Sequence, residues 1–186
     1  MRVIIALLAL LLACPAHAII LVGFGEGGGT CLTQSTDVSL TTNNASSTFT
    51  YSANDRGQSW KAGATGTLYS ITLYRNDNTA YSSDLGIRIG NNKDLSATYT
   101  TAFTCHVRSD VGAVECVIPE ADRPSLTAGS TYYMMMVVTQ SYQGSWSIAR
   151  DSAGGYADGT AYTDITKDYN GTAAVSDLYF VAKMCD

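Results

Sequence analysis

The side chains best suited to chemistry in this sequence are aromatic and polar groups in or near turn-rich segments. A tyrosine ring offers a flat apolar face with a polar edge, which suits stacking on sugar rings, while amide and charged groups bond hydroxyls. The residues that combine these properties are Tyr81, Tyr142, Tyr156 and Tyr162, with Asn76, Asn78, Arg150 and Asp151 interleaved among them. Together they predict a binding site for a glycan or another surface polymer. For each tyrosine, packing at a strand or corner is the alternative.

Tyr156 is the residue in this set that we would test first. It follows Gly154-Gly155 and precedes Gly159. Glycine on both sides allows a ligand or another backbone to approach closely. The alternative is that the Tyr156 ring caps the core at a corner of the fold.

Groups suited to catalysis are sparse. A Ser–His–Asp site needs a histidine, and His106 is the only one beyond residue 17. Paired carboxylates hydrolyse glycosides without histidine, but most of the 13 Asp and 3 Glu stand beside Gly, Ser or Asn, where Asp favours turns. The chain has no G-x-S-x-G segment. We therefore predict a protein that is not an enzyme.

A cluster of oxygen-bearing side chains in the C-terminal third suggests a structural calcium site. Carboxylate and amide oxygens are the ligands that calcium prefers. The candidates are Asp158, Asp164, Asp168 and Asn170. The spacing of a complete EF-hand loop is absent, and solvated turn residues are the alternative. No other cofactor is expected.

The N-terminus has the features of a secretory signal. Arg2 precedes an apolar core at residues 3–13, and Ala16-His17-Ala18 fits the cleavage pattern. We predict cleavage after Ala18 and a secreted protein, extracellular or periplasmic. One alternative is a lipobox at residues 11–14 that would leave a lipid on Cys14 and tether the protein to a membrane. The other alternative is an uncut signal that anchors the chain.

Charge and composition exclude other partners. Charged residues make up 15% of the chain, the formal net charge is −5, and no basic patch is present. Nucleic acid is therefore not an expected partner. Membrane binding is not expected unless Cys14 is lipidated.

Cysteine spacing predicts two disulfides. Four cysteines lie beyond residue 18: Cys31, Cys105, Cys116 and Cys185. An even number in an exported chain favours disulfides. A hairpin folded at Asp110-Val111 would place three pairs opposite each other: Phe103 with Ile118, Cys105 with Cys116, and Val107 with Val114. A slip of one residue would break all three pairs. We predict Cys105–Cys116 from this register and Cys31–Cys185 by exclusion.

Hydrophobic alternation predicts an all-β fold. Apolar residues recur with a period of two, or in short apolar runs bounded by turns, as in strands. The predicted strands lie at 19–24, 47–51, 68–75, 85–90, 103–107, 114–118, 132–138, 146–148 and 177–182. The run Met134-Met135-Met136 indicates a central strand buried on both faces, and Trp60 and Trp146 are expected in the core.

These elements predict an antiparallel two-sheet β-sandwich, jelly-roll-like, of about eight strands. The predicted organisation is a signal peptide at 1–18, an N-terminal strand with a Gly-rich segment at 19–34, and a β-sandwich domain at 35–186.

Four segments in this order form a recognisable pattern: Gln58-Ser59-Trp60, LTAGSTYY at 126–133, GGYADGTAY at 154–162, and Asp177-Leu178-Tyr179-Phe180. Across roughly residues 57–182 the chain resembles jelly-roll, carbohydrate-binding-like modules of bacterial surface and secreted proteins. This resemblance implies a fold and no particular ligand, because its motifs are structural. Trp60 stands where the pattern usually has Phe, and the pattern does not require the Cys105/Cys116 pair.

The prediction for function is a secreted, non-catalytic binding module. It would recognise glycans or a surface polymer through end loops at 76–82 and 140–162, because loops on a rigid scaffold commonly carry recognition. The alternative is a structural protein that self-associates in an extracellular surface, matrix or filament through its tyrosine-rich faces.

Overall fold

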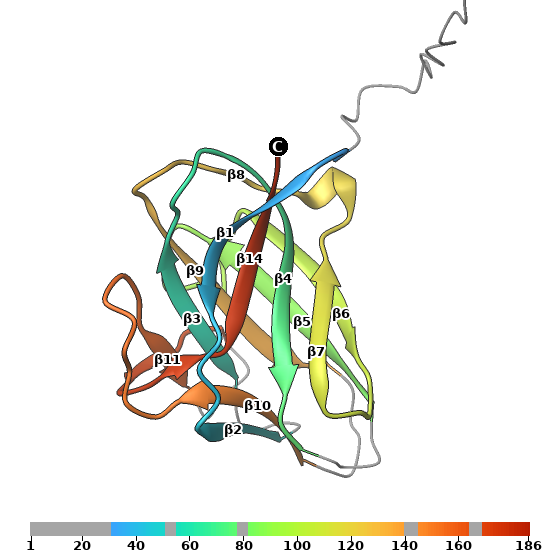
Figure 1. Cartoon of the computed structure of the whole chain (residues 1–186), viewed down its shortest axis with the longest axis vertical. Coiled ribbons are helices and arrows are strands. Elements are labelled where there is room, and N and C mark those ends of the chain that lie inside the picture. Colours follow the sequence, from blue (N-terminus) through green and yellow to red (C-terminus); the bar gives the residue numbers. More distant parts are fainter. Residues whose placement is uncertain (1–30, 51–54, 78–81, 140–144, 164–168) are drawn as a thin grey trace, which may run out of the picture.

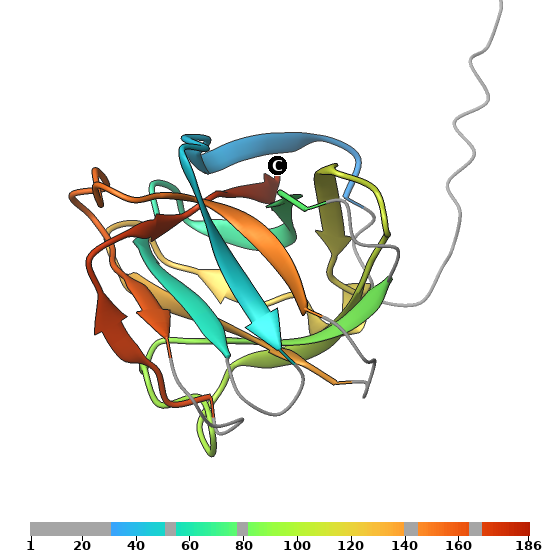
Figure 2. The same ribbon diagram turned by 90° about the horizontal axis from the view of Figure 1, so that it is seen from below.

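The computed structural model of the chain describes residues 31–50, 55–77, 82–139, 145–163 and 169–186. These residues form fourteen β-strands and one short 3-10 helix, η1 (Glu120–Asp122). The strands make two antiparallel sheets that pack face to face (Figures 1 and 2), so the predicted all-β sandwich is confirmed. The strand number exceeds the predicted eight because several strands are only two or three residues long.

The larger sheet has eight strands. They are β1 (Gln34–Leu40), β2 (Ala45–Thr50), β4 (Gly66–Arg75), β7 (Gly112–Val117), β8 (Ser125–Leu126), β10 (Ser145–Asp151), β13 (Asp177–Leu178) and β14 (Phe180–Cys185). The main path runs β1-β14-β4-β10-β13, with β2 attached to β10 and both β7 and β8 attached to β4. The strand predicted at 177–182 is thus two strands, because β13 pairs with β10 whereas β14 pairs with β1 and β4.

The smaller sheet has six strands in the order β12-β11-β3-β9-β5-β6. They are β3 (Arg56–Lys61), β5 (Ser83–Gly90), β6 (Thr101–Val107), β9 (Thr131–Val138), β11 (Ala161–Thr163) and β12 (Thr172–Ala174). All three methionines of the run in β9 are at most 1% exposed. Met134 and Met136 face the core, whereas Met135 packs on the outer face against the backbone at Gly57 and Gly171. The predicted strand buried on both faces is confirmed.

The core between the sheets is built around Trp60, which is fully buried. Its ring centroid lies 6.0 Å from that of Tyr132 in the same sheet and 5.8 Å from that of Phe180 in the opposite sheet. The expectation that Trp60 lies in the core is confirmed. The Trp146 side chain lies outside the described part of the structure.

The predicted hairpin at residues 103–118 is wrong, although the disulfide inferred from it is present. β6 pairs with β5 in the smaller sheet, and β7 pairs with β4 in the larger one. Cys105 and Cys116 are bonded, with their Cα atoms 5.2 Å apart. The bridge therefore joins the two sheets rather than two neighbouring strands of one sheet. Alternation shows which side chains of a strand share a face. The same pattern is expected for two strands that face each other across the core and for two hydrogen-bonded neighbours.

The second disulfide, Cys31–Cys185, is also confirmed. It joins the residues before β1 to the end of β14, and Gln34 of β1 is the register partner of Cys185. The signal peptide at 1–18, the strand at 19–24 and Cys14 lie outside the described residues. Within the described part of the chain, no helix is long and apolar enough to span a membrane.

Candidate ligand-binding site

A cavity of about 610 Å³ opens at one end of the sandwich. This is the end that carries η1, at the top of Figure 1, whereas β2 and β10 lie at the opposite end. Two segments distant in sequence line it: Tyr99, Thr100, Thr101 and Ala102 from the start of β6, and Ala121, Asp122, Arg123, Pro124 and Ser125 around η1 and β8. The cavity thus lies where a strand of one sheet meets a connection of the other.

Tyr99 supplies the aromatic group of this cavity. It lies near the end of the connection from β5 to β6. In this connection the Asp94 N–H donates to Asn92 Oδ1, and the Ser96 N–H donates to Asp94 Oδ1, as is common in turns. The hydroxyl and backbone N–H of Ser96 both bond to Asp94 and lower the pKa of its carboxyl. Tyr99 is 45% exposed. A large apolar side chain with that exposure at a cavity wall is available for contact with a ligand.

Arg123 and Asp122 supply the charged groups. Arg123 follows η1, and its Nε donates to the Ile118 carbonyl oxygen at 3.1 Å. Its guanidinium carbon lies 4.9 Å from the Tyr69 ring centroid, and its Nη1 lies 4.0 Å from Cys185 Sγ. These contacts fix the arginine at the wall, while Asp122 is exposed.

Thr101 is a buried polar group at the same wall. It shares the inward face of β6 with Phe103 and Cys105 and is only 4% exposed. Its Oγ1 has no hydrogen-bond partner among the described residues. A buried hydroxyl without a partner is costly, and Thr101 belongs to the lining of the cavity.

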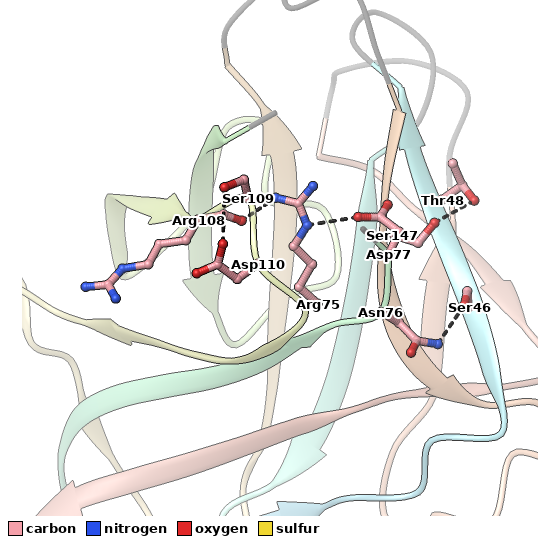
Figure 3. Close-up of polar contacts among 9 residues, drawn as sticks. All are labelled: Ser46, Thr48, Arg75, Asn76, Asp77, Arg108, Ser109, Asp110 and Ser147. Atoms are coloured by element: carbon pink, nitrogen blue, oxygen red, sulfur yellow. Dashed lines mark hydrogen bonds and ion pairs between the residues drawn. The ribbon is translucent and has the colours of Figure 1, made fainter. Parts of the chain in front are cut away.

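The sequence-predicted residues Asn76, Arg150 and Asp151 meet at the opposite end of the sandwich. Asn76 donates from Nδ2 to Ser46 Oγ at 2.8 Å (Figure 3), and Arg150 donates from Nε to the Ser46 carbonyl oxygen at 3.0 Å. Asp151 accepts from Asn44 Nδ2 at 3.0 Å. All three bonds tie β4 or β10 to β2 and the residues before it, so these side chains already have partners within the fold.

Figure 3 shows a buried arginine at this end as well. The Arg75 side chain is fully buried at the end of β4, and its Nε lies 2.9 Å from Asp77 Oδ1. Its Nη1 donates to the Arg108 carbonyl oxygen in the β6–β7 connection. The arginine therefore ties the end of β4 to the β6–β7 connection at the end opposite the cavity, and a buried charge is stable only with such partners.

Tyr156 packs at a corner of the sandwich. Its ring lies against the core, and its backbone N–H donates to Asp177 Oδ2 at 2.8 Å. Burial raises the pKa of the phenol. Asp177 is itself buried and accepts from Gln58 Nε2 at 3.0 Å. These contacts are the corner packing that stands as the alternative to ligand binding, and the ligand role stays a prediction.

We expect Tyr156→Ala to lower the free energy of unfolding by about 2 kcal/mol through lost packing, and Tyr156→Phe to lower it by less, because the phenylalanine ring keeps that packing. Because the pKa of the Tyr156 phenol is raised in the folded state, the phenol contributes fully to the free energy of unfolding below about pH 10. This contribution is lost as pH rises through the folded-state pKa. Urea unfolding at about pH 8 and again above about pH 10 measures both effects. Unchanged stability of Tyr156→Ala would contradict the packing role.

The remaining predicted residues are dispersed. Tyr162 lies in β11 on the outer face of the smaller sheet, with its ring centroid 5.8 Å from that of Tyr133. Asp158 is exposed between β10 and β11, and Asn170 forms an isolated bridge with Asp94. Five residues lie outside the described part of the chain: Tyr81, Asn78, Tyr142, Asp164 and Asp168.

The structure leaves the calcium and enzyme predictions untested. Across the described residues, no three His, Cys, Asp or Glu side chains converge on one point, while two of the four calcium candidates are not described. His106 lies on the exposed face of β6, with Nδ1 2.6 Å from Asp84 Oδ1.

Sequence reasoning missed Tyr99, Thr101, Asp122 and Arg123. The signals were present as a tyrosine among small polar residues, at 96–101, and as a Glu-Ala-Asp-Arg-Pro segment shortly after a strand. Neither signal indicates that the two segments meet, since two strands of different sheets, β6 and β7, lie between them in the chain.

No protein-family model matches the chain, and a search of curated proteins finds no match. The resemblance to carbohydrate-binding-like modules therefore stays a prediction.

Proposed function

We propose that the protein is an exported, non-catalytic module that binds a glycan in the cavity lined by Tyr99 and Arg123. The observation that carries this proposal is the combination, in one cavity of about 610 Å³, of an exposed tyrosine with hydroxyl, carboxylate and guanidinium groups. Sugar sites use an aromatic face for the ring and a few placed polar groups for its hydroxyls.

The cavity chemistry favours a neutral sugar over an anionic one. Asp122 and Arg123 are adjacent in the wall, so their formal charges cancel there. The hydroxyls of Thr100, Thr101 and Ser125 add donors and acceptors without charge. The volume is within the range of small-ligand sites, about 300–1,000 Å³.

Export is part of the proposal. The signal-like residues 1–18 support it, and so do the two disulfides, since disulfides persist in oxidising compartments. Intact mass of exported protein tests it, because cleavage after Ala18 and a lipid on Cys14 give different masses.

We expect Tyr99→Ala to weaken binding of a glycan about tenfold, which corresponds to about 1.4 kcal/mol, because stacking on the ring is lost. The thermal midpoint should change little, since Tyr99 is 45% exposed. A glycan array on the mature protein identifies a ligand, and calorimetry then compares wild type with the variant.

Tyr162→Ala is the control, because Tyr162 is also a tyrosine with a partly accessible ring but does not line the cavity. Binding lost in Tyr162→Ala and kept in Tyr99→Ala would place the ligand on the outer sheet face instead. An array without hits, together with concentration-dependent self-association in light scattering, would favour the structural assembly alternative.

A further inference from the structure

Two chain segments cross the outer face of the smaller sheet and meet above Arg88. One runs from Asp94 to Tyr99 and the other from Tyr169 to Gly171. Asp94 and Asn170 form an isolated β-bridge, and the Leu95 N–H donates to the Tyr169 carbonyl oxygen at 3.0 Å. The segment that carries the cavity tyrosine is therefore held against a second segment more than sixty residues later in the chain.

Arg88 contacts both segments at once. Its Nη1 donates to the carbonyl oxygens of Leu95 and Ser96, each at 2.8 Å. Its guanidinium carbon lies 4.6 Å from the Tyr99 ring centroid and 4.1 Å from the Tyr169 ring centroid. Both distances are within the range of cation–π contact. One planar cation thus stacks on two tyrosines and bonds the backbone that connects one of them to the sheet.

The sheet surface beneath these segments has room for them. A Cβ at Gly86 would lie 2.7 Å from the Tyr169 hydroxyl oxygen, and one at Gly90 would lie 3.2 Å from the Tyr99 Cα. A side chain at either position would therefore force these neighbours to move, and glycine allows the close approach on both sides of Arg88. Tyr169 itself has a φ of 59°, which is uncommon for a bulky residue and persists only where surrounding contacts hold it.

We propose that Arg88 is the positioning residue of the ligand cavity: it holds one face of the Tyr99 ring and presents the other face to the ligand. Arg88 does not line the cavity, so it acts through Tyr99 and not by touching the ligand. This inference rests on the proposed glycan function for its effect on binding, while the effect on Tyr99 is a property of the free protein.

The test compares Arg88→Met, which keeps the length of the side chain but removes the planar cation, with Arg88→Lys, which keeps the charge without the fork that bonds two carbonyls. Arg108→Met is the matched control, because the Arg108 side chain is exposed. NMR of protein with isotope-labelled tyrosine rings follows Tyr99, assigned with Tyr99→Phe, in the absence of ligand.

We expect Arg88→Met to shift the ring signals of Tyr99 and Tyr169 and to weaken glycan binding about fivefold to tenfold. Arg88→Lys should give smaller changes, and Arg108→Met should give none. Added to Tyr99→Ala, Arg88→Met should weaken binding no further, because a residue that acts only through Tyr99 has no effect without it.

Unchanged Tyr99 signals in Arg88→Met would overturn the inference, and so would a full additional loss of affinity in the double variant. If the wild type binds no glycan, the proposed function fails. The ring signals of the free protein still decide whether Arg88 positions Tyr99.

Discussion

Replacing Cys31 and Cys185 together by alanine is expected to lower the free energy of unfolding by about 5 kcal/mol. The bridge joins residues 154 positions apart, and the entropy that a cross-link removes from the unfolded chain grows with the logarithm of that separation. It also ties β1 to β14 at the edge of the larger sheet, where an unsupported terminal strand would fray.

The other bridge provides the comparison. Cys105 and Cys116 are 11 positions apart, for which the same relation gives about 3 kcal/mol. We therefore expect the Cys105→Ala/Cys116→Ala variant to be the more stable of the two double variants.

Urea unfolding without reductant measures both variants against the wild type. If the Cys105→Ala/Cys116→Ala variant is the less stable of the two, the covalent link between the sheets contributes more to the free energy of unfolding than loop-closure entropy predicts. Local packing around the buried Cys105 and Cys116 would then decide the order.

Trp60→Ala is expected to cost about 4 kcal/mol. The indole is fully buried between Tyr132 and Phe180, so its removal leaves a cavity that the two sheets cannot close without moving. Rigid, close-packed interiors relax only partially around such a void.

Trp60→Phe is the informative control, because Phe keeps an aromatic ring at this position but lacks the indole N–H. The Trp60 Nε1 is buried without a hydrogen-bond partner among the described residues. Replacing it removes that unpaired donor, which offsets part of the lost packing. We expect a net cost of about 1 kcal/mol, again measured by urea unfolding. A cost for Trp60→Phe equal to that of Trp60→Ala would show that the indole is required for more than its volume.

Sequence reasoning identified polar and aromatic residues that have partners within the fold, and it missed the residues that line the cavity. The glycines beside Tyr156 predict the close approach of a ligand, but a Cβ at Gly159 would lie 2.6 Å from the Tyr156 ring, so this glycine lets the ring pack at a corner. Asn76 and Arg150 were expected in two loops at one end of the sandwich, at 76–82 and 140–162. They do lie at one end, but Arg150 is in β10, and both side chains bond Ser46. A polar side chain in a turn has the same sequence signature whether its partner is a ligand or a neighbouring strand.

The class of fold, the buried methionine strand and the expectation of two disulfides follow from the sequence alone, because side-chain alternation and an even number of cysteines are local or countable properties. Alternation put Cys105 and Cys116 at core-facing positions, but the register that paired them assumed a hairpin that does not form.

Which strands are hydrogen-bonded, and where a ligand cavity opens, depend on long-range contacts that the local sequence pattern does not specify. β6 and β7 face each other across the core instead of pairing, because each finds its partner in a different sheet. The cavity joins Tyr99 to Arg123, and Arg88 stacks on Tyr99 and on Tyr169, far along the chain. Such contacts depend on the order of strands in both sheets, and a period of two carries no information about that order.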